Sequence, residues 1–142
     1  MGEMYTERLL DHYRRPRNKG RLEQPGSPSG AGQLLAAREY NPLCGDEVTV
    51  EVLVEEGCIV EVRFDGRGCA LCMGAASILT EAVRGRGLEE LALFGQDEYL
   101  EELGSTVRPA RLKCALLPWM AFRHAVFDED EWSHLDLNGE TL

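Results

Sequence analysis

Five cysteines are the residues of this chain best suited to bind a metal or to carry sulfur: Cys44, Cys58, Cys69, Cys72 and Cys114. Their number is odd, and the N-terminus has neither the basic start nor the apolar stretch of a signal peptide, which argues against a disulfide framework. In a reducing compartment, clustered thiols more often bind metals or take part in sulfur chemistry. We therefore expect a cytoplasmic protein with a thiol-based site.

Cys44 lies in a segment that predicts a turn, Asn41–Asp46, with the sequence Asn-Pro-Leu-Cys-Gly-Asp. Pro42 and Gly45 favour a turn, which would present the thiol at the end of a strand. Asp46 follows two residues later and can place a carboxylate oxygen beside the sulfur.

Cys69 and Cys114 are both expected at the beginning of a helix. Cys69 follows a Gly-Arg-Gly segment and precedes a helical pattern of apolar residues. The free N–H groups and the positive end of the helix dipole favour a thiolate at such a position. Arg111 and Lys113 add positive charge near Cys114, which also favours a thiolate.

Three thiolates and one carboxylate from three segments predict a four-coordinate metal site made of Cys44, Asp46, Cys69 and Cys114. Sulfur ligands select zinc, copper(I) or iron–sulfur clusters. The spacings between these cysteines are longer than those of zinc fingers, so ordinary buried cysteines remain an alternative.

The other thiols and the histidines favour structural roles. Cys69 and Cys72 form a Cys-x-x-Cys pair, but no thioredoxin-like βαβ pattern surrounds it, so we expect Cys72 to be a spare thiol one helical turn from Cys69. Cys58 begins a predicted strand. His124 lies in an apolar helical pattern and is expected to be a partly buried side chain with a hydrogen-bond partner.

The charge distribution limits the partners. A formal net charge of −10 argues against nucleic-acid binding, and no apolar run is long enough to cross a membrane. A basic N-terminal segment and an acidic stretch at 128–131 are interpreted as solvated faces, with a basic docking edge for an acidic protein as the alternative. The basic residues are Arg8, Arg14, Arg15, Arg17, Lys19 and Arg21.

The length of 142 residues and the periodicity predict a single domain over 1–142 of class α+β, a three-stranded antiparallel sheet with helices packed on one face. The predicted strands are Leu34–Tyr40, a half-buried Val48–Glu55, and Ile59–Phe64. The predicted helices are Thr6–Arg15, one from Cys69 to about Val83, one or two short ones over 88–103, and Arg111–Phe127, kinked or locally unwound at Pro118. A mobile loop is expected over 16–32 and a polar tail over 128–142.

The motifs resemble those of the U-type iron–sulfur scaffold family, which comprises IscU, SufU and the N-terminal part of NifU. The similar segments are Asn41–Asp46, Gly66–Cys69, Arg111–Ala115 and the N-terminal stretch Tyr5–Gly20. The resemblance runs in order over about residues 4 to 127, and four segments in sequence are specific. It implies a SufE/IscU-like fold with Cys44, Asp46, Cys69 and Cys114 gathered at one exposed end.

In function, the resemblance implies a non-catalytic scaffold that holds a transient [2Fe-2S] or [4Fe-4S] cluster, with zinc in the isolated protein. The implied partners are a pyridoxal-phosphate cysteine desulfurase and apo iron–sulfur acceptor proteins, and Cys44 and Cys114 are the candidate sulfur acceptors. A zinc-bound sulfurtransferase similar to SufU is the alternative, which Lys113 favours because IscU-type members have His there. The short spacing between Cys69 and Cys114 lacks the usual SufU insertion and disfavours it.

Overall fold

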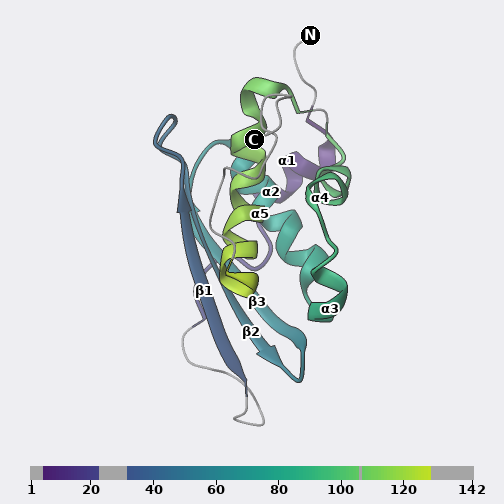
Figure 1. The fold of residues 1–142 in the computed structure, drawn as a ribbon. Coiled ribbons are helices and arrows are strands. Elements are labelled where there is room, and N and C mark those ends of the chain that lie inside the picture. Colours follow the sequence, from purple (N-terminus) through teal and green to yellow (C-terminus); the bar gives the residue numbers. More distant parts are fainter. Residues whose placement is uncertain (1–4, 23–31, 106, 129–142) are drawn as a thin grey trace.

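A three-stranded antiparallel sheet forms one layer of the protein, and helices α2 and α5 cover one of its faces (Figure 1). The computed structural model describes residues 5–22, 32–105 and 107–128. The strands are β1 (Gln33–Tyr40), β2 (Glu47–Glu55) and β3 (Cys58–Arg67), in spatial order β1-β2-β3. The helices are α1 (Glu7–Arg14), α2 (Ala70–Val83), α3 (Leu88–Leu91), α4 (Gln96–Leu103) and α5 (Leu112–Phe127), with a 3-10 turn η1 (Pro109–Arg111). The predicted α+β fold class is confirmed.

The central strand β2 supplies much of the core, because Val48, Val50 and Val52 point toward the helices and are fully buried. The prediction that β2 is half-buried is wrong, however, since Glu51 and Leu53 on the opposite face are also buried. The carboxylate of Glu51 accepts hydrogen bonds from Arg21 and from the backbone N–H of Leu22. A segment distant in sequence therefore covers the outer face at this position.

Helix α2 lies inside the helical layer and is buried on almost every side. Gly74 allows α1 to approach closely, because a Cβ there would lie 2.8 Å from the carbonyl oxygen of Leu9. Thr6 caps α1 by accepting a hydrogen bond from the N–H of Leu9. Helix α1 is thus fixed on α2, and α4 packs against α2 and α5.

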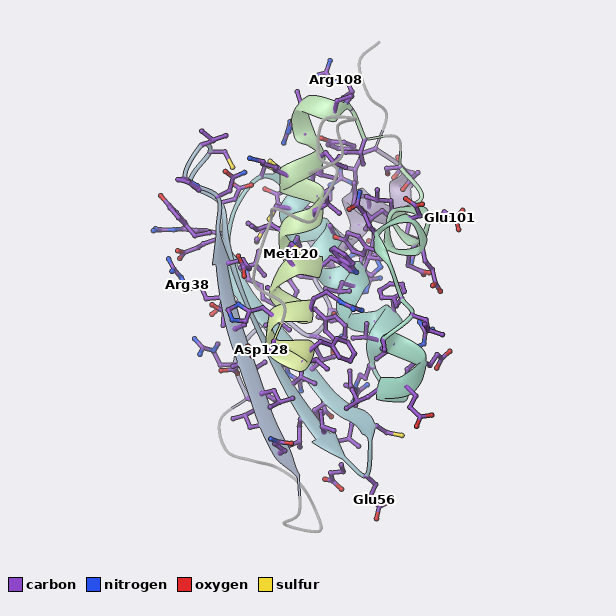
Figure 2. All side chains as sticks on the ribbon, viewed as in Figure 1. Arg38, Glu56, Glu101, Arg108, Met120 and Asp128 are labelled. Carbon is purple, nitrogen blue, oxygen red and sulfur yellow. The ribbon has the colours of Figure 1, made fainter. Side chains whose placement is uncertain are left out.

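Helix α5 packs on β1 and β2 and runs from Leu112 to Phe127 without interruption, so the chain does not unwind at Pro118. Figure 2 shows Met120 midway along this helix, with Arg108 just before its beginning and Asp128 at its end. The side chains around Pro118 are buried, and the indole N–H of Trp119 donates to the carbonyl oxygen of Phe94 at 3.2 Å. Packing on several elements thus holds the helix together across the proline.

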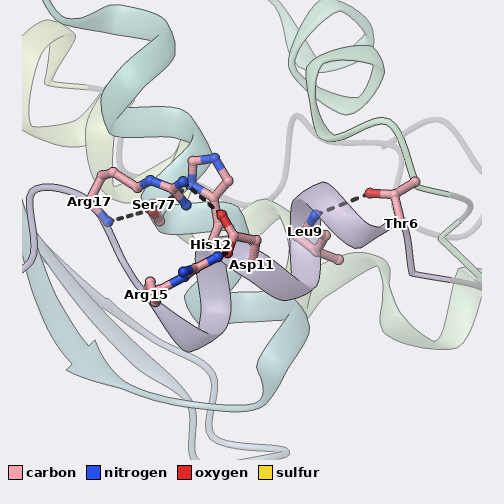
Figure 3. Close-up of polar contacts among 7 residues, drawn as sticks. All are labelled: Thr6, Leu9, Asp11, His12, Arg15, Arg17 and Ser77. Atoms are coloured by element: carbon pink, nitrogen blue, oxygen red, sulfur yellow. Dashed lines mark hydrogen bonds and ion pairs between the residues drawn. The ribbon is translucent and has the colours of Figure 1, made fainter.

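Residues 17–22, which fall in the predicted loop over 16–32, are bonded to the sheet and to α2. The backbone groups of Asn18 and Gly20 pair with those of Phe64 in β3. The N–H of Arg17 donates to the hydroxyl of Ser77 in α2, as Figure 3 shows. Residues 23–31 and the tail beyond Asp128 lie outside the described residues. In the part that the structure describes, no helix combines the length and apolarity needed to cross a bilayer.

Candidate metal centre

The turn that carries Cys44 is built on Asn41, the residue after β1. The side-chain oxygen of Asn41 accepts a hydrogen bond from the N–H of Leu43, and its carbonyl oxygen accepts one from Gly45 at 2.7 Å. Gly45 has a φ of +82°, which favours glycine. The turn leaves the side chain of Cys44 exposed and returns the chain into β2 with Asp46 buried. The predicted turn is confirmed.

The glycines before Cys69 bring this segment against the Asp46 turn. A Cβ on Gly66, whose φ is +146°, would lie 2.2 Å from the carbonyl oxygen of Glu47. A Cβ on Gly68 would lie 2.9 Å from the carboxyl carbon of Asp46. Both contacts are closer than a side chain tolerates, so glycine is required for the Cys69 segment to pack on Asp46.

The third segment is the first turn of α5, which contains Cys114 as its third residue. Helix α5 begins at the end of the sheet where the loop between β1 and β2 lies (Figure 1). One ligand atom each of Cys44, Asp46 and Cys114 lies within 4.8 Å of the others. The two sulfur atoms are 3.9 Å apart, too far for a disulfide. Three of the four predicted ligands therefore lie together.

The carboxyl group of Asp46 has an unusual environment for a buried acid. Asp46 is only 6% exposed, and its Oδ2 atom accepts no hydrogen bond from any described residue. A buried carboxylate oxygen without a partner is unfavourable, and it becomes favourable when a cation binds it. The group of one oxygen and two sulfurs fits zinc or ferrous iron, which accept both ligand types.

Cys69, the fourth predicted ligand, lies just before α2 at the helix N-terminus, as expected, but its sulfur points to another partner. Nη2 of Arg111 donates a hydrogen bond to Sγ of Cys69 at 2.9 Å. Among the described residues, the group with ligand atoms within 4.8 Å does not include Cys69. The structure thus shows a three-residue cluster and a fourth cysteine held beside it.

The ionisation expected for Cys114 is wrong for the metal-free protein. Burial, together with the neighbouring Cys69, Cys44 and Asp46, raises the pKa of the Cys114 thiol to about 12, although a hydrogen bond from Arg111 acts to lower it. Burial also raises the pKa of Cys72, which is completely buried in α2. The sequence could not reveal this effect, because desolvation depends on the whole packed structure rather than on the start of one helix.

A pocket of about 290 Å³ opens beside the cluster, and Cys44 and Cys114 both line it. The remaining walls are formed by Asn41, Leu43, Pro109, Ala110 and Lys113. Leu43 is 82% exposed at its rim. The pocket therefore connects Cys44 and Cys114 to solvent.

The remaining chemistry-bearing residues have other environments. Cys58 is exposed at the start of β3, and His124 contacts Glu39 with 3.0 Å between Nδ1 and Oε2, in agreement with the partner expected for it. Much of the basic N-terminal segment is paired within the chain, which weakens the docking-edge interpretation. The pairs are Arg8 with Glu102, Arg15 and Arg17 with Asp11, and Arg21 with Glu51.

Sequence reasoning missed two residues of this site. It treated Arg111 only as a positive charge near Cys114, and it did not pair Gly68 with Asp46. The glycines before Cys69 do indicate a close backbone approach, but no local signal names Asp46 as the neighbour. No local signal links Arg111 to Cys69.

Comparison with known proteins decides the family. Residues 4–132 match the NifU-like N terminal domain. The chain belongs to this family. Its relatives include the iron–sulfur cluster assembly scaffold protein IscU of Haemophilus influenzae, 33% identical over 87% of this chain and 94% of the relative. The zinc-dependent sulfurtransferase SufU of Bacillus subtilis is 28% identical over 89% of this chain and 92% of the relative.

Solved structures of the NifU-like family share the fold. A putative iron–sulfur cluster assembly scaffold protein for the SUF system from Fervidobacterium islandicum aligns with a TM-score of 0.66 and 25% identity, over 86% of this chain and 96% of that structure. The N-terminal part of a NifU-like protein from Brucella abortus aligns with a TM-score of 0.66 and 21% identity, over 90% and 95%. The relatives of this NifU-like chain thus include both scaffold proteins and a zinc-dependent sulfurtransferase.

Proposed function

We propose that this chain is an iron–sulfur cluster assembly scaffold that accepts sulfur from a pyridoxal-phosphate cysteine desulfurase. Iron and sulfide are its cargo, held by Cys44, Asp46, Cys69 and Cys114 and passed on to apo iron–sulfur proteins. The convergence of Cys44, Asp46 and Cys114, with a buried carboxylate oxygen that lacks a partner, is the observation that carries the proposal.

Cys44 is the first sulfur acceptor in this proposal. Its side chain is exposed at the mouth of the pocket, whereas Cys114 is buried and its raised pKa leaves little thiolate. The Cys44 thiolate attacks the terminal sulfur of the desulfurase persulfide, a new S–S bond forms on Cys44, and the desulfurase cysteine leaves as a thiolate. No net oxidation takes place. Cys114, 3.9 Å from Cys44, is the second candidate acceptor.

Asp46 gives the site its lability. A carboxylate binds iron less strongly than a thiolate does, so its bond is the first to open when an acceptor protein arrives. Conversion of persulfide sulfur to sulfide needs more electrons than ferrous iron supplies, and a thiol reductant or an electron-transfer protein provides the rest. The exposed pocket allows both the donor and the acceptor to reach the site.

A zinc-bound sulfur acceptor without a stable cluster is the second candidate. Lys113 lines the pocket and, as an ammonium group, cannot be a ligand, whereas a histidine could. The similarity to a zinc-dependent sulfurtransferase over most of the chain favours the same role. Here zinc would hold the same four residues in place, and the exposed Cys44 would again accept the sulfur.

One reconstitution separates the two candidates. The protein is purified without oxygen and mixed with desulfurase and cysteine, and the mass of each cysteine-containing peptide is recorded. Ferrous iron and dithiothreitol are then added while the visible spectrum is recorded. Cluster absorbance in near-stoichiometric yield supports the scaffold. Persulfide on Cys44 with zinc retained and no cluster supports the sulfur carrier.

The matched control is Cys58→Ser, which removes a thiol that is exposed at the far end of β3. This variant should behave as the wild type, whereas Cys44→Ser should accept no sulfur and form no cluster. If Cys44→Ser and Cys58→Ser give the same yield of both products as the wild type, both candidate functions are wrong.

A further inference from the structure

The sulfur of Cys69 accepts a hydrogen bond from Arg111 and lies outside the group formed by the other three predicted ligands. Cys44, Asp46 and Cys114 already lie within 4.8 Å of one another, while the sulfur of Cys69 is held by Nη2 of Arg111 at 2.9 Å. Arg111 is the last residue of η1 and directly precedes α5, and its side chain is half-buried. The guanidinium therefore bridges from the beginning of α5 to the beginning of α2.

This is an unfavourable place for a cation unless it has an electron-rich partner. The N-terminal ends of α2 and α5 both carry the positive end of a helix dipole. In these surroundings the guanidinium donates to the sulfur of Cys69 at 2.9 Å and also interacts with Cys114. A metal ion bound to Cys44, Asp46 and Cys114 would compete with the guanidinium for the sulfur of Cys69, because a thiolate–metal bond is stronger than a hydrogen bond to sulfur.

The backbone that carries Cys69 already lies beside the cluster. The preceding residue, Gly68, already packs on the carboxyl group of Asp46 so closely that a Cβ would lie 2.9 Å from its Cγ. The backbone of Cys69 is fixed as well, because its carbonyl oxygen accepts the N–H of Met73 at 3.0 Å. The hydrogen bond from Arg111 favours the rotamer in which the sulfur of Cys69 stays outside the cluster.

We propose that Arg111 is a latch that keeps Cys69 out of the metal shell until a bound cation displaces the guanidinium. The inference rests on the proposed metal site, and Arg111 acts in it as a positioning residue, not as a ligand. Cys44, Asp46 and Cys114 bind the cation first and leave one coordination position open. Cys69 then binds the cation at that position. When the Arg111–Cys69 hydrogen bond forms again, Cys69 leaves the cation and the position reopens.

Cobalt(II) is the probe that tests the latch, because each thiolate bound to it adds charge-transfer absorbance near the ultraviolet. The apoprotein is mixed with cobalt(II) in a stopped-flow spectrometer without desulfurase or iron. We expect two phases for the wild type, a fast one with the intensity of two thiolates and a slower one that adds a third. Arg111→Gln should reach the three-thiolate intensity in the fast phase and bind cobalt about ten-fold more tightly, because no competing conformation is left to displace.

Three further variants make the test specific. Arg111→Lys keeps a cationic donor and should retain a slow phase, whereas Arg67→Gln removes an exposed arginine two residues before Cys69 and should behave as the wild type. Cys69→Ser should abolish the slow phase and leave the fast one. Circular dichroism verifies that each variant is folded.

The latch is wrong if the wild type binds three thiolates in a single phase, or if Arg111→Gln binds cobalt more weakly than the wild type. If the proposed function is wrong but the latch is correct, the experiments give a different result. Cobalt would then bind in the predicted two phases, but neither persulfide nor cluster would form with the desulfurase.

Discussion

Two buried polar regions of this protein differ in whether their polar side chains have hydrogen-bond partners within the chain. The seam between α1 and α2 contains the buried side chains of His12, Ser77 and Thr80, of which Figure 3 shows His12 and Ser77. Nδ1 of His12 lies 2.7 Å from the hydroxyl oxygen of Ser77, which also accepts the N–H of Arg17. Thr80 donates to the carbonyl oxygen of Ser77 at 2.7 Å. His12, Ser77 and Thr80 thus each have a hydrogen-bond partner.

The candidate metal centre contains a buried acid that is not paired in this way. Asp46 is as buried as His12, yet its Oδ2 atom accepts no hydrogen bond from the described part of the chain. Buried polar groups in proteins are nearly always paired, so the seam has the character of a structural contact and the centre that of a site awaiting a ligand. Polar residues in the seam should therefore stabilise the apoprotein, whereas those in the centre should stabilise only the metal complex.

The largest expected effect is that of Asp46→Ala on metal affinity. Loss of a ligand should weaken zinc binding by about 100-fold or more, which is about 2.7 kcal/mol. The apoprotein should be no less stable than the wild type, and up to about 1 kcal/mol more stable, because a buried oxygen without a partner is removed. Competition with a fluorescent zinc chelator and urea unfolding of the apoprotein measure the two quantities.

Glu51→Ala is the matched control, since Glu51 is a buried carboxylate with partners. Arg21 and the N–H of Leu22 donate to it. Its loss should destabilise the apoprotein and leave zinc affinity within about three-fold of the wild type. If Asp46→Ala destabilises the apoprotein as much as Glu51→Ala does, the contrast between the two kinds of buried acid is incorrect.

Ser77→Ala should have the opposite profile. It leaves the ring of His12 and the N–H of Arg17 without the hydroxyl, which should lower the free energy of unfolding by about 1–3 kcal/mol. Zinc affinity should stay unchanged, because α2 keeps its position at Cys69. Thermal unfolding of the apo and zinc-loaded forms tests both statements. A variant that loses zinc affinity but not stability would contradict this description of the seam.

A smaller effect is expected from pH. Burial of His12, and then the charges of Arg17 and Arg8, lower its pKa below 6.5, while Glu81 and Asp11 act in the opposite direction. The unfolded chain thus binds this proton more readily than the folded one does. The contribution of the neutral ring to stability is complete above the unfolded pKa and is lost as pH falls through the folded pKa.

Urea unfolding between pH 8 and 5 should therefore show a stability loss on acidification that His12→Gln reduces. An equal loss in His12→Gln and the wild type would mean that His12 does not contribute to it.

Much of the fold was predictable because its signals are local. Each signal predicts the structure of its own segment. The alternation of valines indicates β2, the residues around Gly45 indicate a turn, and the glycine before Cys69 indicates a close backbone approach. The same signals suggested that Cys44, Asp46 and Cys114 lie at element ends, and the structure places them together.

What the sequence did not reveal depends on contacts between distant segments. Glu51 is buried because Arg21 and Leu22 cover it, and Cys69 is held aside because Arg111 reaches it across 42 positions. The raised pKa of Cys114 likewise follows from burial by several elements and not from its place in one helix. Local periodicity carries no information on such partners.

X-ray absorption at the zinc edge of the loaded protein tests the central claim most directly. We predict a shell of three sulfur atoms at about 2.3 Å and one oxygen at about 2.0–2.2 Å, with the oxygen lost or replaced in Asp46→Ala. A shell of sulfur atoms alone, or one that Asp46→Ala leaves unchanged, would contradict the proposal that Asp46 and the three cysteines bind one ion.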